Sequence, residues 1–197
     1  VFSYDEYEKT IYSAIEKDIA PFNLENILDP VWVNSRGAIA RFDRGSIEIR
    51  IMDVQECPAA DLAIVNLVVE LLKALVNGKF CSVQDQMKMD THVLAALLDK
   101  TSLSGRQTQI DDLPYLAAFG LSSPATAGEL WKHILTKIPA TTFYEKKWQS
   151  VIHTLLDQGS LSERIINSLH QDNSPDRIKS IFKELSVCLA ENRMFVP

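Results

Sequence analysis

The spacing of hydrophobic and polar residues changes along the chain, and these changes predict its elements. Residues 39–42 and 46–52 have the two-residue period of strands. The sequence DRG at 43–45 is typical of a tight hairpin turn, since glycine tolerates positive φ. Residues 4–18 have a helical pattern, and SYDE at 3–6 has the form of a capping box that would start it. We therefore expect a helix followed by an antiparallel hairpin.

A long apolar segment follows the hairpin. Residues 59–77 are apolar on nearly every side and end at an Asn-Gly pair, so we expect a central helix buried over most of its surface. The polar residues 101–112 predict an exposed loop. Ser174 and Pro175 mark the start of the last helix, because proline is favoured at the first helical position. The helices expected after residue 78 are 83–89, 91–100, 127–138, 143–158, 161–170 and 175–192.

These elements predict an α+β fold in which a small antiparallel β-hairpin or partial sheet precedes a mostly helical C-terminal region. We place a boundary after residue 78, so that residues 1–78 hold the first helix, the hairpin and the buried helix. Residues 79–197 would form a helical region packed on them. A two-stranded hairpin is marginal alone, and we expect its edge to be paired, covered by a helix, or in contact with another copy in a homo-oligomer.

Composition narrows the class of protein. The chain has 197 residues, of which 46% are hydrophobic and 23% charged, as in soluble globular proteins. Its net charge of -6 argues against a broad surface for nucleic acid or membrane lipid, so a bound anion would need a local group of arginines. Three widely spaced cysteines favour a reducing, cytoplasmic compartment. The chain starts without methionine and close to a helix, which favours a fragment of a longer protein.

The second predicted strand carries the most informative charges. Alternation places Glu48 and Arg50 on one face, and Ile47, Ile49 and Ile51 on the other, which we expect to pack against the helix at 59–77. The simplest interpretation is a solvated polar face with an ion pair of little energetic value. The alternative is a ligand site at the floor of a cleft, where a carboxylate binds Mg²⁺ and guanidinium groups bind phosphate or carboxylate oxygens. Such a combination suits a reaction that passes through an acyl phosphate.

The residues around this strand resemble a known family. The stretch RFDRGSIEIRIMDVQECPAADLAIVNLVVELLKAL at 41–75 resembles the C-terminal half of bacterial and plant-type glutamate-cysteine ligases and related carboxylate-amine ligases. In that family an arginine-bearing strand leads to a T-x-E-x-R-x-x-D strand and a long apolar helix, and here the second element reads SIEIRIMD. The tail CLAENRMF also looks like the family's tail, and NSRGAIAR followed by SIEIR is more distantly similar to glutamine synthetase. The resemblance covers residues 31–75.

The resemblance implies part of a glutamine synthetase-like catalytic fold and an ATP-dependent, magnesium-dependent ligase. Such an enzyme joins a carboxylate, which is glutamate in the named family of glutathione biosynthesis, to an amine through an acyl phosphate. It implies that Glu48 binds Mg²⁺, that Arg50 contacts the transferred phosphate or the substrate carboxylate, and that Arg36 and Arg41 contact phosphate. The family's other metal-binding glutamates precede the matched region. The missing N-terminal half of the same protein would have to supply them, and this chain alone would not turn over ATP.

Two points qualify these assignments. Strict alternation sets Arg36 and Arg41 on opposite faces, and a bulge at Gly37 would be needed to bring them together. The chain could also be a non-catalytic helical module that recognises a protein partner or its own N-terminal half.

The sequence contains no other motif that points to a metal or nucleotide site. The four histidines lack HxxxH spacing, and there is no GxxxxGK[ST] or GxGxxG motif. Those histidines are His92, His133, His153 and His170.

Overall fold

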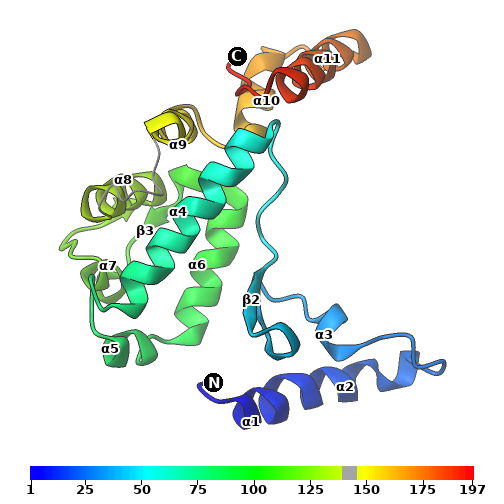
Figure 1. The fold of residues 1–197 in the computed structure, drawn as a ribbon, viewed down its shortest axis with the longest axis vertical. Helices are drawn as coiled ribbons and strands as arrows, with labels where there is room; N and C mark the ends of the chain where they lie inside the picture. Colours follow the sequence, from blue (N-terminus) through cyan, green and yellow to red (C-terminus); the bar gives the residue numbers. More distant parts are fainter. Residues whose placement is uncertain (139–145) are drawn as a thin grey trace. The chain divides into compact units, whose positions relative to one another are not determined.

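The computed structural model describes residues 1–138 and 146–197, which form two compact units, Val1–Val54 and Gln55–Pro197 (Figure 1). The sequence analysis placed the boundary after residue 78. In the structure the boundary precedes α4 (Pro58–Val76), because that helix packs on α9 (Lys146–Gln158) of the second unit. The first three residues of the helix expected at 143–158 lie outside the described residues.

The first unit opens with the helical run expected at 4–18. It consists of α1 (Tyr4–Tyr7), a π-helix η1 (Glu8–Tyr12) and α2 (Ser13–Ile19). The Ser3 hydroxyl accepts a hydrogen bond from the backbone N–H of Glu6, as a capping box requires. The Glu6 carboxylate reaches back to the N–H of Phe2, one residue before the expected partner. A 3₁₀ turn η2 (Ala20–Phe22) and a short helix α3 (Pro30–Val33), which the sequence did not predict, lead to the hairpin.

The hairpin confirms the expected α+β class. β1 (Ala38–Arg41) and β2 (Ser46–Ile49) are antiparallel, with Ile39 opposite Glu48. The turn is formed by η3 (Phe42–Arg44) and by Gly45, whose φ of 58° is in the left-handed region.

The two faces of the hairpin differ in their burial. Because Ile39 and Glu48 are directly opposed, their side chains lie on the same face, and Ile39 is only 2% exposed. On the other face Ile47 is 62% exposed and Ile51 59% exposed. Within the first unit the covered face is therefore the one that carries Glu48, and the expected packing of the isoleucines on residues 59–77, which belong to the other unit, stays a prediction.

The second unit is almost entirely helical. The polar residues 101–112 do not form the expected loop: α6 (Thr91–Ser104) extends into this segment, and β3 (Gln109–Ile110) pairs with β4 (Ala125–Thr126). Thr108 and Ile110 are buried, and the Thr108 hydroxyl donates to the carbonyl of Lys100. The remaining elements of the unit are α5 (Val83–Met87), α6 (Thr91–Ser104), η4 (Gly105–Gln107), α7 (Leu113–Ala118), α8 (Ala127–Lys137), α10 (Leu161–Leu169) and α11 (Pro175–Glu191).

The core of the second unit lies along one side of α4. Small residues on this side, such as Ala60 and Ala63, are fully buried among side chains of α7, α8 and α9. The opposite side of α4 exposes an apolar stripe at a spacing of three and four residues. This stripe consists of Leu62, Val65, Val69, Leu72 and Val76. Within the described residues, no helix is both long and apolar enough to cross a membrane.

Candidate functional site

The hairpin brings three of the four predicted site residues together. Nη1 of Arg41 lies 2.6 Å from Oε2 of Glu48, and Nε of Arg50 lies 2.8 Å from its Oε1. Each carboxylate oxygen therefore holds one guanidinium group. Glu48 and Arg50 share a face of β2 as the period of two predicted, and the register adds Arg41 from β1.

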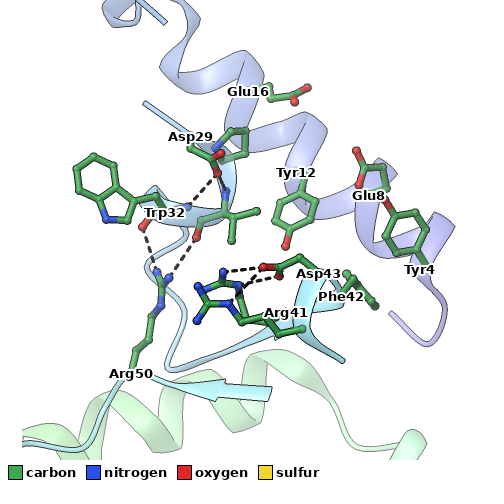
Figure 2. Close-up of a pocket in the computed structure, with 13 residues that line it drawn as sticks. Tyr4, Glu8, Tyr12, Glu16, Asp29, Trp32, Arg41, Phe42, Asp43 and Arg50 are labelled. Carbon is green, nitrogen blue, oxygen red and sulfur yellow. Dashed lines mark hydrogen bonds and ion pairs between the residues drawn. The ribbon is translucent and has the colours of Figure 1, made fainter. Parts of the chain in front are cut away.

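The remaining donors of Arg50 cap a helix. Its Nη1 and Nη2 groups donate to the carbonyls of Val31, Trp32 and Asn34, at the end of α3, and Figure 2 shows the side chain reaching the first two. Carbonyls at a helix end have no partner within the helix, so a cation there satisfies them. Arg50 thereby ties the hairpin to α3.

Arg41 forms a second, forked contact. Its Nε and Nη2 donate to the two carboxylate oxygens of Asp43 at 3.0 and 2.9 Å. Hydrogen bonds from Arg41 and then from Arg50 lower the pKa of Glu48, and the bond from Arg41 lowers the pKa of Asp43. Both carboxylates are consequently ionised at neutral pH. Asp43 was interpreted from sequence only as a turn residue, and nothing in the local pattern marked it as a partner of Arg41.

Arg36 shares a hydrogen-bond partner, Asn34, with Arg50. Its Nη1 donates to Oδ1 of Asn34 at 3.1 Å, and the Asn34 amide donates to the hydroxyl of Tyr7. Asn34 is 1% exposed, so Arg36 and Tyr7 satisfy a buried polar group. Asn34 thus connects Arg36 with Arg50, which donates to its backbone carbonyl, although in the described residues Arg36 forms no ion pair with Glu48.

A cavity of about 700 Å³ adjoins this cluster. Arg41 and Arg50 line it from the hairpin side, together with the turn residues Asp43 and Arg44. The opposite wall is formed by the helical run at the start of the chain, and Figure 2 shows Tyr12 of this run pointing toward Asp43 and Arg41. Four residues at intervals of four supply this wall: Tyr4, Glu8, Tyr12 and Glu16. Sequence analysis missed these residues, although their regular spacing within a predicted helix was a visible signal.

The described residues do not fit a magnesium site on their own. Mg²⁺ needs near-octahedral coordination by oxygen atoms, several of them from protein or substrate. Both oxygens of Glu48 are held by guanidinium groups, and no group of three His, Cys, Asp or Glu side chains in residues 1–138 and 146–197 could hold a metal ion. Glu48 organises two arginines in this structure, and its predicted role as a metal ligand stays a prediction.

Comparison with known proteins gives one distant relative. The chain is 30% identical over 165 residues to an uncharacterized protein of Archaeoglobus fulgidus. The match covers 84% of this chain but 38% of that protein, so the chain spans well under half of its relative's length. No family model and no solved structure matches the chain.

Proposed function

We propose that this chain is the C-terminal part of an ATP-dependent carboxylate-amine ligase of the glutamate-cysteine ligase type, with a glutamine synthetase-like catalytic fold in the whole protein. The observation that supports it best is the convergence of Arg41, Glu48 and Arg50 on one face of the hairpin beside a cavity. A reaction through an acyl phosphate needs cationic groups that neutralise phosphate oxygens as charge moves between them. The chain would contribute these groups in a cytoplasmic enzyme.

The ion pairs define how this cluster would act. Glu48 holds the two guanidinium groups in fixed orientations before a substrate binds, and a phosphate or carboxylate oxygen would then replace one of its oxygens as their partner. Glu48 is thus a positioning residue for Arg41 and Arg50. Any Mg²⁺ bound with ATP would draw its protein ligands from outside the described residues, and we assign no step to it.

The rest of a longer protein is the proposed partner of this chain. The relative from A. fulgidus extends well beyond the matched part, and the hairpin presents an exposed apolar face through Ile47 and Ile51. A two-stranded sheet is marginal alone, and further strands from such a region would enlarge it. This arrangement would also supply the carboxylates that the described residues lack.

Activity of the full-length protein tests the proposal. We expect phosphate release from ATP that depends on both a carboxylate, with glutamate tested first, and an amine. Glu48→Gln and Arg50→Lys should each lower kcat/KM by about 10²-fold or more, because a neutral amide cannot hold two guanidinium groups and an ammonium cannot replace a planar fork. Arg193→Lys, at an exposed ion pair of the second unit, is the matched control and should leave the rate unchanged.

One result of the same experiment would contradict the proposed role of Arg41, Glu48 and Arg50. Folded Glu48→Gln protein with an unaltered substrate-dependent rate would refute the role of the cluster. The 197-residue chain alone should release no phosphate from ATP, because its described residues offer no group of carboxylates that could hold the magnesium ion of MgATP. Folding of each variant is checked by circular dichroism and by its unfolding midpoint.

A second function is favoured by one observation. The exposed apolar stripe on α4, from Leu62 to Val76, is typical of a helix that packs against a protein partner, so the chain could be a non-catalytic interaction module. Titration of the full-length protein with MgATP distinguishes the two functions. Saturable binding that weakens in Arg50→Lys supports the ligase, and absence of binding supports the interaction module.

A further inference from the structure

The two arginines that hold Glu48 differ in their other partners. Arg50 donates its Nη groups to three backbone carbonyls at the end of α3. Those carbonyls would lose this partner if Arg50 turned away, so its contacts are fixed. The other partner of Arg41 is a side chain, the carboxylate of Asp43. A carboxylate can be exchanged for another anion, and Arg41 is therefore the arginine of this cluster that a ligand can bind by exchange.

Asp43 occupies the edge of Arg41 that an anionic ligand would use. Nε and Nη2 of a guanidinium group form a planar fork that fits two oxygens of one carboxylate or phosphate group. The two carboxylate oxygens of Asp43 lie 3.0 and 2.9 Å from these nitrogens, and Figure 2 shows this forked contact among the residues that line the cavity. Nη1 of Arg41 is held by Glu48 at 2.6 Å. The fork is thus oriented in advance, with Asp43 in the place of a ligand.

The exposure of the two side chains favours movement of Asp43 over movement of Arg41. The Arg41 side chain is 16% exposed, whereas that of Asp43 is 57% exposed and lies on the hairpin turn η3. An exposed carboxylate regains water when it leaves its partner, and exposed ion pairs contribute little to stability. Asp43 can therefore turn into solvent at small cost while Glu48 keeps Arg41 in position.

The charges of the hairpin wall match a dianion once Asp43 has turned away. Nε of Arg44 lies 3.4 Å from Oδ2 of Asp43, and Arg44 lines the cavity beside Arg41. With Asp43 in place, the hairpin wall has three arginines against two carboxylates; these arginines are Arg41, Arg44 and Arg50. After its release Glu48 is the only carboxylate that remains among these ion pairs. The excess of two positive charges is the charge that a dianionic phosphoryl group balances.

We propose that Asp43 competes with a phosphoryl group for the forked edge of Arg41, and that the ligand binds there only when Asp43 has turned away. The ligand would accept hydrogen bonds from Nε and Nη2 of Arg41 and would contact Arg44. This exchange adds to the one proposed at Glu48, because it uses a different edge of the same guanidinium group. The inference rests on the anion-binding role that the proposed function gives to Arg41, but it concerns binding alone and needs no ATP turnover.

Calorimetric titration of the 197-residue chain with inorganic pyrophosphate, in about 0.1 M salt without divalent cations, tests this competition. Asp43→Asn keeps the size of the side chain and removes its charge. We expect this variant to bind pyrophosphate at least about threefold more tightly than the wild type, since an exposed ion pair changes an affinity by a factor of up to about five. Asp43→Ser, which keeps a short polar side chain in the turn, should show the same gain. Adding Arg41→Lys to Asp43→Asn should abolish the gain, because an ammonium has no fork.

Two control variants separate the release of Arg41 from a general change of charge. Glu8→Gln removes a carboxylate from the helical wall of the same cavity, and Glu8 has no ion pair with the described residues. Asp18→Asn removes an exposed carboxylate of the same unit that does not line the cavity. We expect a clearly smaller gain in Glu8→Gln than in Asp43→Asn, and an unchanged affinity in Asp18→Asn.

Several results would overturn the proposal. Wild-type affinity in folded Asp43→Asn and Asp43→Ser proteins, or no binding to any of the three, would show that Asp43 does not compete with an anion. An equal gain in Glu8→Gln would assign the effect to the charge of the cavity, and a gain that persists with Arg41→Lys would place the anion elsewhere. Circular dichroism spectra and unfolding midpoints establish that each variant is folded. Failure of the ligase proposal would appear separately, as a full-length protein without ATP turnover in which Asp43→Asn still tightens pyrophosphate binding.

Discussion

The two units of the chain are held together by different kinds of interaction. In the second unit, apolar residues of α4, α7, α8 and α9 form a continuous core that includes the fully buried Leu116. In the first unit, the buried hydrophobic residues are Ile11, Tyr12 and Ile39, and ion pairs and hydrogen bonds connect the helices to the hairpin. Burial of apolar area dominates folding stability, so the second unit has the larger reserve of stability. The candidate chemistry lies in the unit with the smaller core.

The second unit also contains a buried ion pair, in addition to its apolar core. Arg164 and Glu56 are both buried, and Nη1 of Arg164 lies 2.5 Å from Oε1 of Glu56. The backbone N–H of Phe195 donates to the same oxygen at 2.9 Å, and Arg164 also donates to the carbonyls of Phe195 and Gly159. One pair of charges thereby joins the residues before α4, the helix α10 and the C-terminal tail. Residues 188–195, CLAENRMF, are therefore an integral part of this unit.

Removing one charge of this pair should give the largest effect on stability. Arg164→Met leaves Glu56 buried without its partner, and we expect the free energy of unfolding to fall by about 3–5 kcal/mol. Arg193→Met removes an arginine from exposed ion pairs with Glu184 and Glu191, and it should cost about 1 kcal/mol or less. Urea denaturation followed by circular dichroism measures both. Equal effects of the two substitutions would show that burial of the pair does not govern its contribution.

A smaller effect, confined to the first unit, is expected from Asn34→Ala. This substitution removes the acceptor of Arg36 and the amide that donates to the hydroxyl of Tyr7 in a nearly solvent-free position. The loss should be about 1–3 kcal/mol, the range for leaving buried polar groups without a partner. Hydrogen exchange resolved by residue should show faster exchange within residues 1–54 and unchanged protection in α4. Faster exchange in α4 as well would contradict the independence of the two units.

The two units also show which elements of the fold could be predicted from local sequence signals. Local signals predicted the longer helices and the hairpin, with Ser174 capping α11 and Gly45 closing the turn with positive φ, but they missed the short helices α3 and α7. The segment 101–112 was mistaken for a loop because its order comes from distant partners, such as the hydrogen bond from the N–H of Ala127 to the carbonyl of Thr108. Local composition carries no information about such contacts.

The candidate site was predictable to a similar degree. Alternation correctly placed Glu48 and Arg50 on one face, but it cannot say which face a neighbouring element covers. The short helix α3 was not recognised, and its carbonyls, together with that of Asn34, are what draw Arg50 and its face toward the helices. The partnership of Arg41 with Asp43 and the alignment of Glu8 with Tyr12 depend on turn geometry and on a π-helix, neither of which the hydrophobic pattern encodes.

The smallest expected effect is a loss of unfolding free energy at acidic pH. Burial raises the pKa of Glu56, but hydrogen bonds from Arg164 and from the N–H of Phe195 outweigh this, and the pKa lies below the ordinary value of a glutamate. A carboxylate with a lowered folded-state pKa contributes stability that is fully present above its unfolded pKa and is lost as pH falls through the folded pKa. We therefore expect the free energy of unfolding of the second unit to decline below about pH 4.5, the usual carboxyl range.

The contribution of Glu56 to this decline can be isolated by substitution. Glu56→Gln should be less stable than the wild type at pH 7 and should lose less stability between pH 5 and the lower limit of folding, because its amide does not titrate. The pKa values of Glu48 and Asp43 are also lowered, but Glu48 is only half-buried, Asp43 is exposed and salt screens their pairs, so Glu48→Gln should change the slope less. Free energies of unfolding from urea titrations at half-unit steps of pH measure these slopes. A slope in Glu56→Gln as steep as that of the wild type would assign the acid sensitivity to other carboxylates and remove the buried pair from the explanation.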